Sequence, residues 1–180
     1  MMDRIKCQKG YTLILVMVCL SLFTITIIYM LETSLMERLI SRNSRDAEQA
    51  FQLAEGAVYM GAEQVYQVIS RDYRTVEKLP STIQLQESDF YDSVEGRTLK
   101  MRITNPRLIE QHNDYCLYVF TGEGQCSPAE SRLKAQVRFD YVQYYAIEYG
   151  EDGSEIDRVF THREFMHRGN IIRMEKELEG

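Results

Sequence analysis

The sequence predicts an α+β fold in which one long N-terminal helix, membrane-spanning in its first half, packs on a small antiparallel β-sheet. Three observations predict it: a run without charged residues from Tyr11 to Leu31, an apolar helical period that continues without proline to Leu79, and three β-rich segments after Pro80. The 180 residues provide for one modest globular domain and an anchor. The expected segments are a leader at 1–10, a transmembrane half-helix at 11–31, an exported half-helix at 32–79 and a β-rich domain at 80–180.

The apolar run, YTLILVMVCLSLFTITIIYML, is long enough to cross a membrane. At about 1.5 Å of rise per residue, a helix of this length covers the roughly 30 Å of a bilayer's hydrocarbon core. Before it, Arg4, Lys6 and Lys9 stand against Asp3 alone. Because positively charged flanks stay in the cytoplasm, we expect a cytoplasmic N-terminus and an extracytoplasmic domain after Glu32.

Two other interpretations share this hydropathy pattern. A secretory signal peptide also begins basic and continues apolar, but this run exceeds the usual core of such peptides. The residues that follow are Glu32, Thr33 and Ser34, which offer no small-residue cleavage site. A plain uncleaved anchor explains the hydropathy equally well.

Beyond the apolar run, the helical period persists. Apolar residues recur mostly at threes and fours up to Ile69, with a polar gap at Asn43 and Ser44, and Pro80 is expected to end the helix. The second half is rich in small residues, namely Ala47, Ala50, Ala54, Gly56, Ala57, Gly61 and Ala62. Glycine inside a helix costs about 1 kcal/mol relative to alanine, so another backbone is expected to approach closely. A sheet is the expected neighbour, with a coiled coil as the alternative.

Three segments after Pro80 are predicted as strands of an antiparallel meander that covers the helix: Thr98–Thr104, Tyr115–Thr121 and Leu133–Val142. Turns are expected between them at Asn105-Pro106, Gly122-Glu123-Gly124 and Ser127-Pro128. Residues 144–160 are expected to hold one more strand with a turn at Asp152-Gly153. A short helix and a partly disordered tail both fit the charged residues 161–180.

Composition and spacing favour neither nucleic-acid binding nor catalysis. The net charge is −6, and without the leader 18 Lys and Arg stand against 26 Asp and Glu, a net charge of −8. We interpret three basic residues, Arg132, Lys134 and Arg138, as solvated strand positions rather than as a phosphate-binding patch. Residues weighed as metal or phosphate ligands lack the required spacing: His112, His162, His167, Gly122, Asp152, Gly153 and Glu155. We therefore expect no cofactor, no metal site and no enzymatic activity.

The four cysteines divide by position. Cys7 lies in the leader and Cys19 in the apolar run, whereas Cys116 and Cys126 lie in the exported part. An oxidising compartment permits a Cys116–Cys126 disulfide that would close a loop of about ten residues. Two free thiols a strand apart are the alternative.

The leader junction resembles a known processing signal. Lys9-Gly10, followed by Tyr11-Thr12-Leu13-Ile14 and the apolar helix, is similar to the class III signal of type IV pilins and type II secretion pseudopilins. In that family a membrane-bound prepilin peptidase cuts after the glycine and methylates the new terminal amine. The resemblance implies cleavage between Gly10 and Tyr11 and N-methylation of Tyr11.

A second stretch resembles the N-terminal region of PilX-type minor pilins. It runs from Met36 to Val65, and its most specific residues are Arg45, Asp46, Ala50, Phe51, Gln52, Ala54 and Glu55. The two stretches cover about a third of the chain. They imply a non-enzymatic minor pilin of a type IV pilus or a related filament, acting in assembly or at the tip. The implied partners are other pilins, prepilin peptidase, the inner-membrane assembly machinery and membrane lipid.

One departure from the family pattern concerns position in the filament. Most pilins carry a glutamate at the fifth residue after the cut, thought to neutralise a neighbour's terminal amine, and this chain has Leu15 there. A buried amine without a partner charge is costly, which argues against stacking on identical copies. PilX-type minor pilins and K-type pseudopilins share this loss. Two alternatives stay open: an uncleaved bitopic membrane protein with an extracytoplasmic binding domain, and an extracytoplasmic enzyme.

Overall fold

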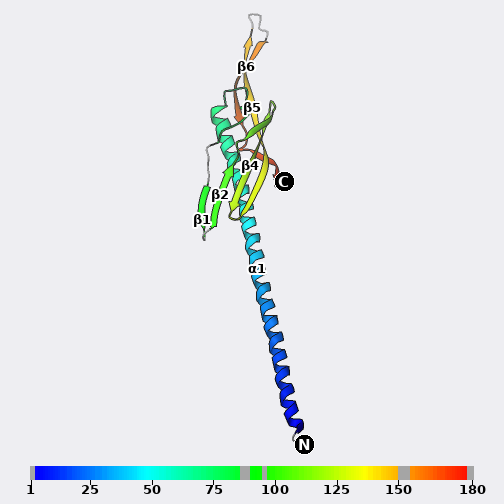
Figure 1. Ribbon diagram of the computed structural model, residues 1–180. Coiled ribbons are helices and arrows are strands. Elements are labelled where there is room, and N and C mark those ends of the chain that lie inside the picture. The colour runs from blue at the N-terminus through cyan, green and yellow to red at the C-terminus, as the bar shows by residue number, and fades with distance from the viewer. Residues whose placement is uncertain (1–2, 86–89, 95–96, 150–154, 178–180) are drawn as a thin grey trace. The chain divides into compact units, whose positions relative to one another are not determined.

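The structure is a computed structural model that describes residues 3–85, 90–94, 97–149 and 155–177. Helix α1 comprises Asp3–Asp72, 70 residues without a break (Figure 1). The chain forms two compact units, Met1–Arg45 and Asp46–Gly180. In the first unit, the described residues are all helical; the second contains the rest of α1 and all the strands.

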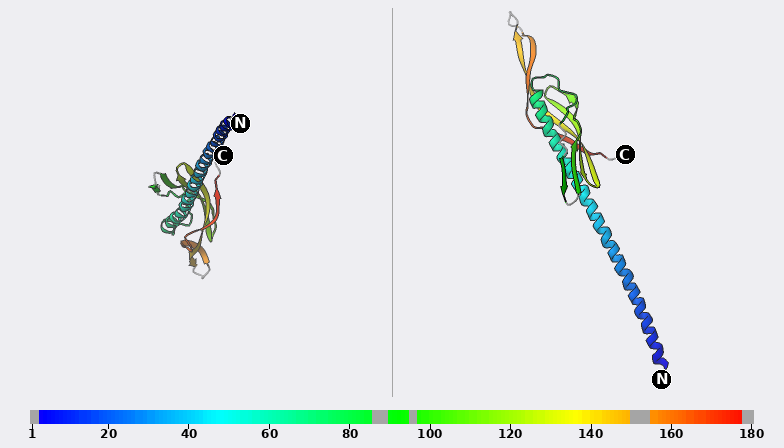
Figure 2. Two further views of the ribbon diagram at one scale, coloured as in Figure 1. Left: turned by 90° about the horizontal axis from the view of Figure 1, so that it is seen from below. Right: turned by 60° about the vertical axis from the view of Figure 1, so that its left-hand side comes forward.

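The second unit is an antiparallel sheet of seven strands against which the last part of α1 lies (Figures 1 and 2). The strands are β1 (Phe90–Val94), β2 (Arg97–Ile103), β3 (Arg107–Gln111), β4 (Tyr115–Cys126), β5 (Ala129–Tyr149), β6 (Glu155–Phe165) and β7 (Asn170–Lys176). The order along the sheet is β1-β2-β4-β5-β6, with β3 also on β4 and β7 also on β5. The predicted α+β class is confirmed, and the three predicted strands lie side by side as β2, β4 and β5, although β3 comes between β2 and β4 in the chain.

Strand β4 is the centre of the sheet. It pairs with β5 over its whole length, from Tyr115 opposite Asp140 to Cys126 opposite Ala129. Along its other edge, β3 pairs with the first part and β2 with residues from Gly122 onward. The burial of β4 alternates strictly, so one face of the sheet meets the helix.

The core lies between that face and α1. The helix contributes Val58, Val65 and Ile69, all fully buried, and the strands contribute mainly aromatic and branched residues: Tyr118, Phe120, Leu133, Val137, Phe139 and Tyr141. Helix positions three, four and seven apart share a face, which explains why these residues are buried while Tyr59 stays exposed. The predicted packing of the helix on a sheet is confirmed.

Strand β5 extends beyond β4. Its first half pairs with β4 on one edge and with β7 on the other, whereas residues Tyr141–Tyr149 pair with β6. Figures 1 and 2 show this β5–β6 ribbon continuing past the remaining strands. We call residues 141–149 and 155–165 the ribbon.

The helix ends seven residues earlier than predicted, at Asp72 rather than Leu79. Hydrogen bonds from Arg163 of β6 fix the backbone of residues 74–77, where helical hydrogen bonds were expected. The N–H of Arg163 in β6 donates to the carbonyl of Arg74 at 2.8 Å, and its buried guanidinium donates to the carbonyls of Val76, at 2.6 Å, and Glu77. Bonds to distant strands therefore replace the last predicted helical turns, a contact that periodicity does not report.

Two further expectations are wrong. Gly122 and Gly124 lie inside β4 rather than in a turn, and the chain reverses after Cys126, at Ser127-Pro128, whose peptide bond is cis.

Residues Thr161–Phe165 belong to β6 and Asn170–Lys176 form β7, so neither a terminal helix nor a disordered tail describes them. The expected turn at Asp152-Gly153 lies outside the described residues.

Candidate functional site: the apolar helix segment and the motif on the sheet

The segment Tyr11–Leu31 of α1 has the properties of a membrane span. It carries no charged residue, and every side chain in it is exposed within this chain. The helix is long and apolar enough to cross a membrane, and none of its most apolar window is buried in the structure. A helix with a uniformly apolar surface requires an apolar environment, which the described residues of this chain do not supply.

Three hydroxyl side chains of this segment bond to the helix itself. Ser21 donates to the carbonyl of Met17 at 2.7 Å, Thr24 to that of Leu20 at 2.8 Å, and Thr26 to that of Leu22 at 2.6 Å. A hydroxyl in hydrocarbon finds no water, so back-bonding to the i−4 carbonyl satisfies its donor. These residues are therefore compatible with lipid on all sides.

The expected processing residues lie at the start of this segment. Gly10 falls within the bounds of α1, and Tyr11 and Leu15 are both exposed, at 73% and 54%. Leu15 continues the apolar surface of the segment without a charge. Cleavage between Gly10 and Tyr11 and methylation of Tyr11 stay predictions.

One half of the motif that resembles PilX-type minor pilins is buried against the sheet. Asp46, Ala50 and Ala54 are 1%, 0% and 0% exposed. Opposite them lie Gly122 and Gly124 of β4. A Cβ on Gly122 would lie 2.6 Å from the Ala54 carbonyl oxygen, and one on Gly124 would overlap the backbone of Ala50 and Ala54. Alanine on the helix and glycine on the strand together allow the two backbones to approach.

The other half of the motif faces outward. Arg45 and Gln52 are exposed, Phe51 is 40% exposed, and Glu55 is partly exposed. The motif residues thus divide between packing and surface. Sequence reasoning found the motif but missed its partners on β4, because glycines spaced by one residue also suggest a turn.

Of the two alternatives for Cys116 and Cys126, a disulfide or two free thiols, the structure has the free thiols. Both residues are buried free thiols on the same strand, ten residues apart, which in an extended chain is about 33 Å. A bridge requires Cα atoms within about 7 Å. Burial raises the pKa of the Cys116 thiol to about 12, and the Cys126 thiol donates to the Gln49 side-chain oxygen at 3.3 Å.

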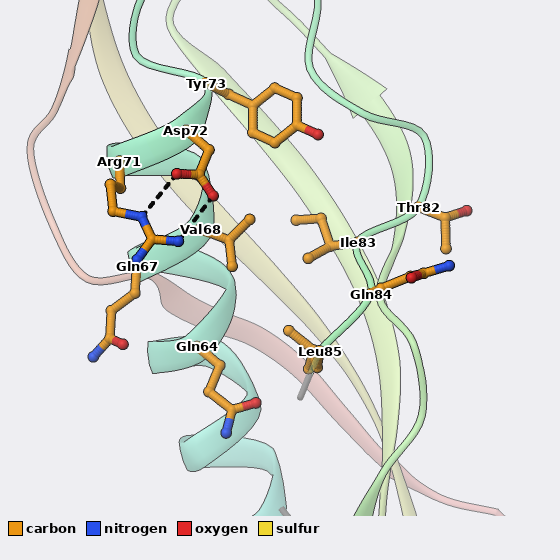
Figure 3. Close-up of a pocket in the computed structure, with 10 residues that line it drawn as sticks. All are labelled: Gln64, Gln67, Val68, Arg71, Asp72, Tyr73, Thr82, Ile83, Gln84 and Leu85. Atoms are coloured by element: carbon orange, nitrogen blue, oxygen red, sulfur yellow. Dashed lines mark hydrogen bonds and ion pairs between the residues drawn. The ribbon is translucent and has the colours of Figure 1, made fainter. Parts of the chain in front are cut away.

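A groove of about 670 Å³ lies beside the end of α1 (Figure 3). Figure 3 shows Val68 of the helix and Tyr73, the residue after its end, facing Ile83 and Leu85 across the groove, with the Arg71–Asp72 ion pair at its edge. Its remaining lining residues are Gln64, Gln67, Thr82 and Gln84. Among the described residues that line the groove, no nucleophile is paired with a base.

The described residues include no group of three His, Cys, Asp or Glu side chains placed to hold a metal ion. His112 stacks on Tyr115 and His162 stacks on Tyr144, at ring-centroid distances of 4.5 Å and 4.6 Å. These histidines therefore take part in aromatic packing on strands.

A membrane-length apolar helix, continued by a half that packs small residues on an antiparallel sheet, defines a membrane-anchored protein with a pilin-like fold. The family model described as PilX N-terminal matches residues 10–58, which include both the leader junction and the motif. Together with the apolar helix, this match supports a type IV pilin-like protein, a class whose members are generally structural. No curated protein and no solved structure matches the chain.

Proposed function

We propose that this chain is a minor pilin, or a pilin-like structural component, of a type IV pilus or a related type II secretion-like filament. It would act in filament assembly or at the tip, without enzymatic activity. The observation that carries this proposal is the family-model match over residues 10–58, on a helix whose apolar segment has no partner within the described chain.

The proposal includes a processing step. Prepilin peptidase would cut between Gly10 and Tyr11 on the cytoplasmic side and methylate the Tyr11 amine. Removal of Arg4, Lys6 and Lys9 deletes the basic leader while leaving the apolar segment in the bilayer. The protein would first span the inner membrane with its domain outside the cytoplasm, and then join the pilus at the cell surface.

Leu15 supports a position in the filament at which this subunit does not stack on identical subunits. An amine buried among apolar helices needs a neighbouring carboxylate, and this chain offers none at that position. We therefore propose that the subunit contacts other pilins and minor pilins but does not stack on copies of itself. The assembly machinery of the inner membrane and the surrounding lipid complete its expected partners.

The test compares two glycine variants in cells that assemble filaments. Gly10→Ala should prevent leader removal, leave a larger protein in the membrane and exclude it from sheared filaments. Gly56→Ala is the matched control, because Gly56 is exposed and, among the described residues, a Cβ there would contact Met101 Sδ alone, at 3.7 Å. An uncleaved bitopic protein predicts instead that Gly10→Ala changes neither size nor function, and that result would overturn the proposal.

A further inference from the structure

The ribbon has one edge that no described strand covers. Strand β4 begins at Tyr115, opposite Asp140, so β5 continues past it from Tyr141 to Tyr149 with β6 on its other side. Figures 1 and 2 show β5 and β6 running alone in this part of the sheet. The edge of β5 that pairs with β4 up to Asp140 therefore has no described partner strand beside residues 142–149.

The direction of the backbone groups identifies which residues face that edge. The N–H of Tyr141 donates toward β4, to the Asp114 carbonyl at 2.8 Å, whereas the Asp140 carbonyl accepts from Met166 on the β6 side. Because these groups alternate along a strand, the N–H and C=O groups of odd-numbered residues point away from β6. The free groups belong to Gln143, Tyr145, Ile147 and Tyr149, and no described backbone group bonds to them.

This edge lacks the usual protection. Proteins block exposed edges with lysine, proline or bulges, because unpaired N–H and C=O groups invite another strand. Residues 142–149, VQYYAIEY, contain neither lysine nor proline. The two irregularities of the ribbon place their extra residues, Ile156 and Thr161, on β6, so β5 itself runs regularly.

Most side chains beside the edge are aromatic or aliphatic and exposed, and two of the tyrosines are held by ring contacts. Tyr144, Tyr145 and Ile147 are 43%, 43% and 41% exposed, and Tyr149 is 66% exposed. Tyr144 stacks on His162, and Tyr145 packs edge-on against Phe160 at 5.9 Å. Ordered aromatic side chains on an open edge reduce the entropy lost when a partner binds.

Charge indicates the chemistry of that partner. Glu148 lies directly opposite Asp157, two carboxylates on the same face of the ribbon, while Arg158 is paired with Glu155. Residues 46–180 hold 15 Lys and Arg against 24 Asp and Glu, a net charge of −9. Like-charged copies repel, whereas a strand that carries lysine or arginine is attracted.

We propose that the β5 edge formed by residues 143–149 accepts an extended strand of another protein, apolar at alternate positions and basic beside Glu148 and Asp157. The added strand would continue the line of β4 and bond to the four free backbone positions. This inference goes beyond the pilin-like role and does not depend on processing at Gly10.

The test uses the full-length chain in lipid nanodiscs and a fluorescent peptide of about ten residues in which valine and lysine alternate. Binding is followed by anisotropy, and hydrogen exchange locates the peptide. We expect protection at Gln143, Tyr145 and Ile147, and a loss of affinity of about tenfold or more when alternate peptide nitrogens are methylated. Equal affinity for the methylated peptide, or protection elsewhere, overturns the proposal.

Two matched variants separate the edge from general charge attraction. Ile147→Lys places a lysine beside the edge and should weaken peptide binding about tenfold, whereas Ile172→Lys, at an exposed position of β7 outside the ribbon, should change it less than about twofold. Equal effects of the two variants contradict the proposal. Sedimentation of the chain alone completes the test, since a dimer abolished by Ile147→Lys would make a second copy the occupant and overturn the proposed partner.

Discussion

Gly122 of β4 lies so close to Ala54 of α1 that a Cβ on the glycine would stand 2.6 Å from the Ala54 carbonyl oxygen. The obstacle is backbone, which cannot rotate away as a side chain can. This contact joins the PilX-like motif of the helix to the central strand of the sheet.

We therefore expect Gly122→Ala to destabilise the protein by about 2 kcal/mol or more, because the helix must shift or the strand must bend. Urea unfolding of the full chain in detergent measures the change. Gly56→Ala serves as the control, since its new methyl group meets open space apart from Met101. Equal stability of the two variants would show that the helix and β4 are not in close contact.

Gly61 provides a second test inside the helix. Helix propensity alone predicts that Gly61→Ala and Gly56→Ala each stabilise the protein by up to about 1 kcal/mol. A Cβ on Gly61 would lie 2.6 Å from Phe120 Cε2, so Gly61→Ala should destabilise instead, by about 1–2 kcal/mol. Combining it with Phe120→Leu should recover part of the loss in a double-mutant cycle. Additive effects would contradict the proposed contact.

Arg163 is the largest fully buried side chain among the described residues and holds the backbone that follows α1. Its guanidinium donates to the carbonyls of Val76 and Glu77 and lies 4.9 Å from the Tyr141 ring centroid. Arg163→Met should cost about 2–4 kcal/mol, because two carbonyls lose their donor. Arg173→Met, which removes an exposed ion pair with Glu175, should cost less than about 1 kcal/mol. Similar losses for both variants would refute the role of Arg163.

Stability should fall at alkaline pH. Burial raises the pKa of Cys116 to about 12 and that of Tyr141 to about 12, and it also raises the pKa of Tyr118. A raised pKa in the folded state means that the unfolded chain releases these protons first, so the stabilisation is complete below about pH 9 and is lost as pH rises toward 12.

Urea midpoints at about pH 8 and about pH 10.5 measure this loss. Cys116→Ala should reduce the drop, because one of the buried acids is removed. Tyr59→Phe should leave the profile unchanged, since Tyr59 is 58% exposed. A flat pH profile would contradict the burial of these groups.

The helix and the central strands follow from local pattern. The absence of charge from Tyr11 to Leu31 and the spacing of apolar residues beyond it reflect the environment of each helical face, which periodicity reports directly. The strands β2, β4 and β5 appear as alternating apolar segments for the same reason. The small residues Ala50 and Ala54 correctly indicated a close backbone.

What the sequence did not reveal depends on contacts between distant segments. Gly122 and Gly124 suggest a turn unless the helix that they face is known. The end of α1 depends on Arg163, about ninety residues later, and the strands β6 and β7 depend on pairing with β5. The open edge of the ribbon is likewise a property of where β4 begins, which no local pattern contains.

The most direct test of the proposed pilin-like role is the intact mass of the protein from cells with and without prepilin peptidase. With the peptidase, we expect a chain that begins at Tyr11 and carries one methyl group on its amine. Without the peptidase, we expect the leader intact. An unaltered leader in both strains would contradict the central claim.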